Sequence, residues 1–161
     1  MRFFSLVSLV VFVLACGNAQ DEKVAGLETQ LNALIEEKNV IDTVNRLFVS
    51  TDNRDWENVK ACFADEFVLD MTSMVGGEPS KLTPQQIADA WDQGLKGLKA
   101  IHHQAGNYDV SLKGSEAEVF CYGIATHYLP NDTGNNSRMF VGSYNFHLKK
   151  MGNDWKIDHF K

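Results

Sequence analysis

After Ala100 the chain carries the pattern that most restricts its fold: two pairs of strand-like segments joined by tight turns. The segments HHQAGNYDVSLKG and EAEVFCYGIATHYL meet at KGSE, and the segments RMFVGSYNFHLKK and DWKIDHF meet at MGN. Short polar, glycine-containing turns between apolar runs are typical of β-hairpins. We therefore expect an antiparallel meander, with PNDTGNNS as the loop between its two halves.

The segments before Ala100 have mostly helical patterns. From Asp21 to Ser50 apolar residues recur at helical spacing, which predicts one long helix or two helices in line. Three further elements are expected: a helix at Trp56–Phe63, a strand at Glu66–Met74, and a helix from Thr83 to about Leu98. This order predicts an α+β domain with helices on one face of a curved sheet.

The size and charge of the chain limit its function. With 161 residues, 44% of them hydrophobic, it can form about one domain with a real core. Its formal net charge of -6 comes without a basic stripe, so nucleic acid is not an expected partner.

The N-terminal segment is predicted to be a signal peptide at residues 1–15. Arg2 precedes a short apolar run, and the run ends in VLAC, which resembles a bacterial lipobox with Cys16 as the lipidated residue. Ordinary secretory cleavage after GNA is the alternative. The expected product is an exported lipoprotein, periplasmic or at the cell surface, that contacts the membrane only through its lipid; the alternative is a secreted protein.

The rest of the chain divides into a tether at 16–23, a helical extension at 24–38 and a domain at 39–161. The extension has near-heptad spacing of apolar residues, so it can pair with a second copy or dock on the domain. Cys62 and Cys121 lie among apolar neighbours, which favours two buried thiols over a disulfide. No metal-binding spacing is present, so neither a metal nor a cofactor is expected.

Small residues in the predicted strands leave room for a pocket. A period of two places Val119, Cys121, Gly123, Ala125 and His127 on one face of their strand. In the next strand Phe140, Gly142, Tyr144 and Phe146 share a face. Glycine beside hydrogen-bonding side chains is compatible with a concave pocket, and equally with bends of a twisted sheet.

Taken together, these segments resemble the SnoaL-like branch of the nuclear transport factor 2-like superfamily. The resemblance rests on the order and spacing of Asp52-x-x-x-Trp56, FADEFVLDM, HHQAGN, AEVFCYGIATHYL and GSYNFHLKKMGNDWKI, over roughly residues 41–160. The order is similar to that of scytalone dehydratase and bile-acid 7α-dehydratase. The family fold implies a cone, in which a curved, mostly antiparallel sheet and helices enclose a pocket, and which is usually a homodimer through the outer sheet face.

The resemblance also implies site residues. The catalytic aspartate of scytalone dehydratase falls on Asp52, its first histidine on His103, and its second near His127 after a small gap. Residues with other chemistry stand at its substrate-binding positions, so the resemblance supports a reaction type more than a substrate. The candidate substrate-binding residues here are Thr51, Met71, Asn107 and Tyr144.

Two functions remain open from the sequence. The first is a cofactor-independent lyase (dehydratase) or isomerase acting on a small hydrophobic or polycyclic hydroxy-carbonyl compound. His103, oriented by Asp52, would act as the base, and His127 or Tyr144 as the donor. The second is a non-catalytic module of the same fold that binds a small ligand or dimerises.

Overall fold

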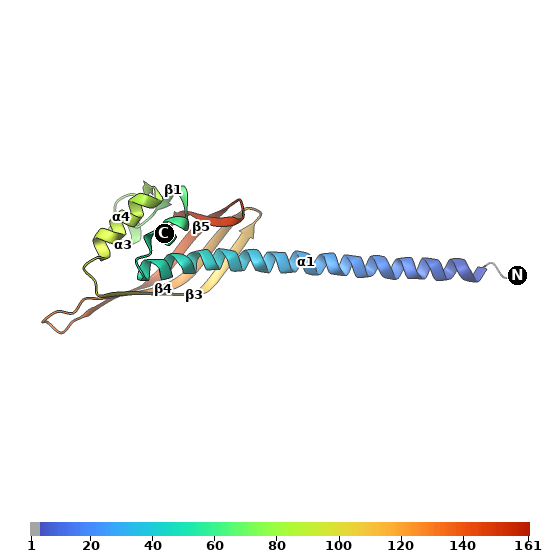
Figure 1. Ribbon diagram of the computed structural model, residues 1–161, viewed down its shortest axis with the longest axis horizontal. Coiled ribbons are helices and arrows are strands. Elements are labelled where there is room, and N and C mark those ends of the chain that lie inside the picture. The colour runs from blue at the N-terminus through green and yellow to red at the C-terminus, as the bar shows by residue number, and fades with distance from the viewer. Residues whose placement is uncertain (1–3) are drawn as a thin grey trace. The chain divides into compact units, whose positions relative to one another are not determined.

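The computed structural model describes the backbone of residues 4–161 and the side chains of residues 20–161. The chain divides into two compact units, with the boundary between Glu36 and Glu37. Helix α1 (Phe4–Asp52) runs through this boundary, so the periodicity predicted from Asp21 to Ser50 belongs to one helix (Figure 1). The segment predicted as a tether, residues 16–23, is part of α1. The predictions of a signal peptide and of a lipid on Cys16 depend on side chains that lie outside the described residues.

The unit Glu37–Lys161 contains one six-stranded sheet in the order β2-β1-β6-β5-β4-β3. Its strands are β1 (Phe63–Leu69), β2 (Ser80–Leu82), β3 (Ala100–Lys113), β4 (Glu116–Tyr128), β5 (Ser137–Met151) and β6 (Asp154–Phe160). The four C-terminal strands form the expected meander, and all neighbouring pairs are antiparallel except β1 and β6. The predicted α+β class is confirmed.

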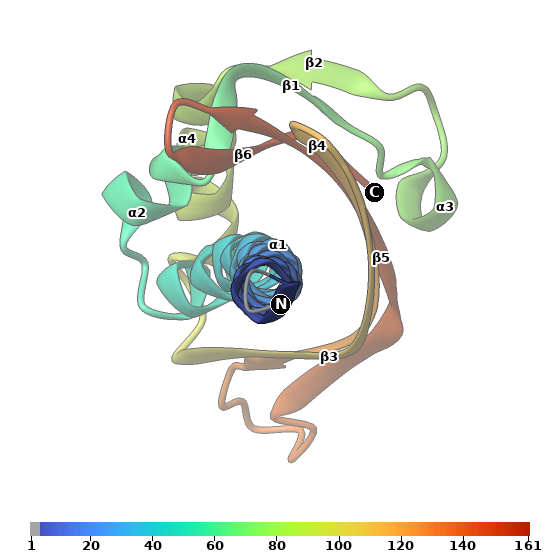
Figure 2. The same ribbon diagram turned by 90° about the vertical axis from the view of Figure 1, so that its right-hand side faces the viewer.

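The C-terminal part of α1 fills the concave side of this sheet. Val40, Val44, Leu47 and Phe48 recur at helical spacing and are buried in a core shared with β4, β5 and β6. Figure 2 shows β3, β4 and β5 curving around this part of the helix. Burial of such an apolar stripe against a sheet face is the main stabilising contact that an amphipathic helix can make.

Three of the predicted elements end differently in the structure. The strand predicted at Glu66–Met74 is instead β1, which ends at Leu69, followed by the short helix α3 (Thr72–Val75). The reason is Asp70, whose carboxylate accepts hydrogen bonds from the backbone N–H and hydroxyl of Thr72 and so turns the chain. The helices α2 (Trp56–Ala61) and α4 (Pro84–Leu95) are shorter than predicted but in the expected places.

The inner face of the sheet is the face predicted from the period of two. Val119, Cys121 and Ala125 of β4 are buried, and Gly123 between them is also buried. Both Cys62 and Cys121 are free, buried thiols, as expected. Burial raises the pKa of the Cys121 thiol to about 11, so it is not a reactive thiolate at neutral pH. No helix in the described part of the chain has the length and apolar content needed to cross a bilayer.

Candidate active site

The end of α1 places Asp52 opposite the edge strand β3. The helix stops because Arg54 adopts a left-handed conformation with a φ of 55°. The Arg54 guanidinium donates hydrogen bonds to the carbonyl oxygens of Leu95 and Leu98 at 3.2 and 2.8 Å, which ties this turn to the end of α4. The turn that directly follows Asp52 is therefore held against the end of α4.

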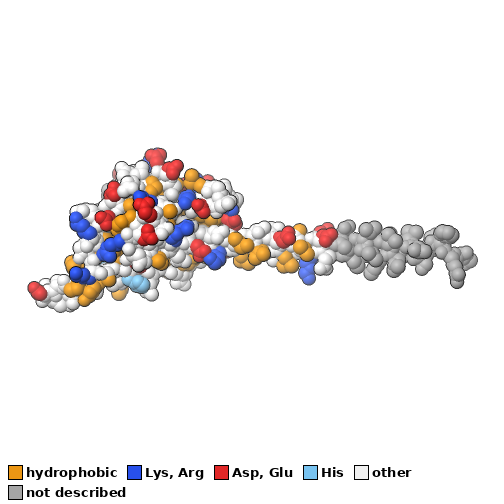
Figure 3. Space-filling model, in the orientation of Figure 1, with side chains coloured by type: hydrophobic (Ala, Val, Ile, Leu, Met, Phe, Trp, Pro, Cys, Tyr) orange, Lys and Arg blue, Asp and Glu red, His pale blue; other side chains and the backbone are white. Residues whose placement is uncertain are grey.

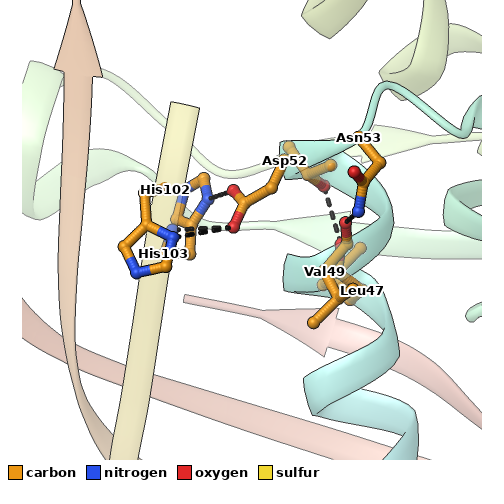
Figure 4. A network of polar contacts seen from close by, with 7 residues as sticks. Leu47, Val49, Asp52, Asn53, His102 and His103 are labelled. Carbon is orange, nitrogen blue, oxygen red and sulfur yellow. Dashed lines mark hydrogen bonds and ion pairs between the residues drawn. The ribbon is translucent and has the colours of Figure 1, made fainter. Parts of the chain in front are cut away.

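The Asp52 carboxylate binds His103 through both oxygens. Its Oδ1 lies 2.6 Å from Nδ1 of the His103 ring, and its Oδ2 accepts the His103 backbone N–H at 2.9 Å (Figure 4). The neighbouring His102 is mostly exposed, and its Nδ1 lies 3.8 Å from Oδ2. The side chains of Asp52 and His103 are only 15% and 14% exposed, so this contact is shielded from bulk water.

This geometry selects the chemistry of His103. A carboxylate that accepts a hydrogen bond from Nδ1 holds the neutral ring in the tautomer whose Nε2 carries the lone pair. The ring also stacks on Phe48, with centroids 5.3 Å apart and planes 20° apart, which restricts its rotation. His103 is thus oriented as a base through Nε2.

A cavity of about 290 Å³ adjoins this pair. Its lining comes from α1, α4, the segment at 69–74, and the inner face of β3–β6, and is largely apolar, with Phe48, Leu69, Trp91, Phe140 and Phe160 among its residues. Its volume lies at the lower end of the range of small-molecule sites, about 300–1,000 Å³.

His127 and Tyr144 line the same cavity and supply two further polar groups. The His127 and His103 ring centroids are 6.5 Å apart, with the rings edge to face. Burial, assisted by the nearby His103 and Arg138, lowers the pKa of His127, so its ring is neutral at pH 7. Burial raises the pKa of Tyr144, so its hydroxyl stays protonated.

The Tyr144 hydroxyl is available to a ligand. Every fully buried side-chain nitrogen or oxygen in the described part of the chain has a hydrogen-bond partner. Tyr144 lines the cavity, so its side chain faces the space that a ligand would occupy.

The two mid-strand glycines have different roles. A Cβ on Gly123 would lie 2.0 Å from Cε2 of Tyr144, so the tyrosine ring lies directly over this glycine. A Cβ on Gly142 would meet no atom within 4 Å, so this glycine leaves open space. Neither glycine lines the cavity itself, but Gly123 makes room for the ring of Tyr144, which does.

Three of the four candidate substrate-binding residues lie in the lining of the cavity. Thr51, Met71 and Tyr144 line the cavity, although the Thr51 hydroxyl donates its hydrogen to the Leu47 carbonyl oxygen at 2.7 Å. Asn107 does not line it. This residue is exposed in an irregularity of β3, with a φ of 57°, and the irregularity turns it away from the alternation that the sequence pattern assumes.

Sequence reasoning missed Asp70 and Lys161, a second charged pair in the cavity lining. Lys161 Nζ lies 3.1 Å from Asp70 Oδ2. Hydrogen bonds from Thr72, and then the charge of Lys161, lower the pKa of Asp70 to about 2. The Asp-x-Thr pattern signals a local turn, but no sequence signal pairs residues so far apart. Within residues 20–161, no group of three or more ligating side chains is placed to hold a metal ion.

The sequence matches the model of the SnoaL-like domain over residues 32–161. The chain belongs to this family. No functionally curated protein matches the sequence. Among solved structures, the SnoaL-like domain is similar to the Kfla4162 protein of Kribbella flavida, with 19% identity, 80% of this chain and 90% of that chain covered, and a TM-score of 0.76.

Two other similar structures carry names of lyases. One is a proposed scytalone dehydratase of Novosphingobium aromaticivorans, with 14% identity, 80% and 83% of the two chains covered, and a TM-score of 0.68. The other is the hexachlorocyclohexane dehydrochlorinase LinA-type3 of Novosphingobium barchaimii, with 13% identity, 81% and 87% covered, and a TM-score of 0.68. At these identities the similarity establishes the nuclear transport factor 2-like fold.

Proposed function

We propose that this SnoaL-like protein is a cofactor-independent lyase or isomerase that removes a proton next to a carbonyl group of a small hydrophobic compound. The observation that carries the proposal is the 2.6 Å contact between Asp52 and His103 beside a largely apolar cavity. The named dehydratase and dehydrochlorinase neighbours support a lyase-type reaction.

The reaction begins at His103. Its Nε2 accepts the proton from the carbon next to the carbonyl, and the electron pair of the broken C–H bond moves to the carbonyl oxygen as an enolate. The Asp52 carboxylate stabilises the imidazolium that forms, and a low-polarity surrounding strengthens that interaction. Acid–base catalysis of this kind contributes about 10²–10⁴-fold to a rate.

Tyr144 and His127 are the groups placed to act on oxygen. The protonated Tyr144 hydroxyl can donate a hydrogen bond to the enolate oxygen. Collapse of the enolate then expels a hydroxyl group on the next carbon, which takes the proton from the His103 imidazolium and leaves as water. If that proton goes to a different carbon instead, the outcome is isomerisation. His127, with its neutral ring, can donate a second hydrogen bond to an oxygen of the substrate through its N–H.

A panel of small cyclic β-hydroxy ketones tests this proposal, because loss of water forms a conjugated enone with strong ultraviolet absorbance. We expect turnover by the wild type and a loss of at least about 10²-fold in Asp52→Asn and in His103→Gln. The double variant should lose little more than either single one, since the two residues act as a unit.

The chain offers a matched control for these variants. His147 and Asp158 form a second histidine–aspartate contact, between β5 and β6, and neither lines the cavity beside Asp52. Asp158→Asn should therefore keep wild-type turnover. If Asp52→Asn and Asp158→Asn have the same activity, the proposed role of Asp52 is wrong.

The alternative is a binding module, and the apolar character of the cavity favours it as a second candidate. Met71 and Met74 are among the lining residues, and their flexible side chains can adapt to different ligands. In that case a ligand should copurify from the native host and be found by mass spectrometry, and Asp52→Asn should change its affinity without any chemical conversion being detected.

A further inference from the structure

The described part of α1 before the domain carries an exposed apolar stripe, which we define as Val24, Leu27, Leu31, Leu34 and Ile35. These side chains are between 44% and 63% exposed. Figure 3 shows hydrophobic side chains gathered along one side of this part of the helix. A soluble helix seldom leaves so regular a stripe uncovered, so the stripe marks an interaction surface.

The spacing of the stripe is that of a coiled coil. With Val24 at position a of a heptad, Leu27 falls at d, Leu31 at a, Leu34 at d and Ile35 at e. The β-branched Val24 at the first a position and the leucines at both d positions are the residues of this stripe that favour two strands. Lys38 takes the following a position, and a single polar residue there specifies register and the number of strands.

The charges beside the stripe indicate which direction the partner runs. In this register Lys23 is at g and Glu28 at the e position that follows, so two parallel copies place Lys23 of each opposite Glu28 of the other. An antiparallel pair with the same apolar layers would place the two Glu28 side chains together, which is unfavourable. The charge pattern therefore fits a parallel second copy of this chain.

We propose that the stripe forms a parallel, in-register, two-stranded coiled coil between two copies of this chain. The contact spans about two heptads, so its affinity is modest and rises when both copies are held at high local concentration. The proposal does not depend on the reaction proposed above, because it uses no residue of the cavity.

Disulfide cross-linking of the full chain in the membranes and extract of a bacterial host tests the proposal. Leu27→Cys should give a disulfide-linked dimer on mild oxidation, at least about fivefold more than the matched control Thr29→Cys, which lies at the outward f position. Wild-type protein, which retains its own cysteines, sets the background. Adding Leu31→Glu to Leu27→Cys should abolish the dimer, whereas adding Asn32→Glu, one residue further at the outward b position, should not.

The relative direction of the two paired helices is tested by coexpression of Val24→Cys and Leu34→Cys chains that carry different tags. In a parallel pair these positions are about 15 Å apart along the axis, too far for a disulfide. Cross-linking between the two tagged chains would overturn the parallel arrangement. Equal cross-linking of Leu27→Cys and Thr29→Cys, or cross-linking of Leu27→Cys only to another protein, would overturn the pairing itself.

Discussion

Asp52 is the last residue of α1, where a carboxylate is unfavourable beside the helix dipole, and its carboxylate is directed at His103 instead of at the helix. The backbone turn is closed by Asn53 and Arg54, which bond to Val49 and Thr51, so the helix end does not need Asp52. Both carboxylate oxygens are instead bound to His103. We therefore interpret Asp52 as a residue retained for the site.

At the residue scale, Gly123 should be required for the position of Tyr144. Gly123→Ala would force the tyrosine ring off the strand, at a cost of about 1–3 kcal/mol in the free energy of unfolding, as in other overpacked cores. Gly142→Ala is the matched control, because its Cβ enters open space and should change the free energy by no more than about 0.5 kcal/mol. Urea unfolding of both variants measures the difference. Equal effects would show that Tyr144 does not depend on Gly123.

Asp70 gives a prediction about acid stability. Its pKa in the folded protein, about 2, lies below the ordinary 3.8, so its contribution to stability is complete above pH 3.8 and is lost as the pH falls through about 2. Between about pH 5 and pH 2 the unfolding midpoint of the wild type should therefore fall more than that of Asp70→Asn. Asp65→Asn, a change at an exposed carboxylate, should behave like the wild type. A parallel fall in all three proteins would contradict the role given to Asp70.

At the element scale, the helices and strands that show a regular apolar period were predicted correctly from the sequence. The meander, the long helix and the inner face of β4 follow from spacings within single segments, and all are observed. The prediction that the strand extends to Met74 was wrong, because the hydrogen bonds of Asp70 with Thr72 turn the backbone after Leu69. The meeting of Asp52 and His103 joins residues 51 positions apart, so no local pattern contains it; only the resemblance to a family pointed to it.

The outer face of the sheet leads to a prediction about assembly. Tyr122, Met139 and Val141 are 58%, 63% and 75% exposed, and Ile124 pairs directly with Val141 across the β4–β5 ladder. We propose that this face joins two copies in a homodimer. In a Leu31→Glu background, which removes the pairing proposed for α1, Val141→Lys should weaken dimerisation at least about tenfold in a dilution series followed by light scattering, because it buries a charge. Asn153→Lys in the β5–β6 turn should have no effect, and a wild-type monomer at micromolar concentration would refute the dimer.

At the scale of the whole molecule, the remaining question is where in the cell this domain acts. We propose export and attachment through a lipid on Cys16. Cys16→Ala should move the protein from the membrane fraction to the soluble fraction or leave it unprocessed, because it removes the residue that would carry the anchoring acyl chains. Wild-type protein that is fully soluble after export, with Gln20 as its first residue, would contradict this proposal.

The central claim is that Asp52 and His103 together remove a proton from carbon, and this step is common to lyases and isomerases. Deuterium incorporation from D₂O into small cyclic ketones, followed by NMR, measures it without knowledge of the natural product. We predict exchange catalysed by the wild type and by Asp158→Asn, with a loss of at least about 10²-fold in Asp52→Asn and His103→Gln. Exchange that is absent from the wild type across the panel while a ligand still binds, or that persists unchanged in Asp52→Asn, would contradict the account.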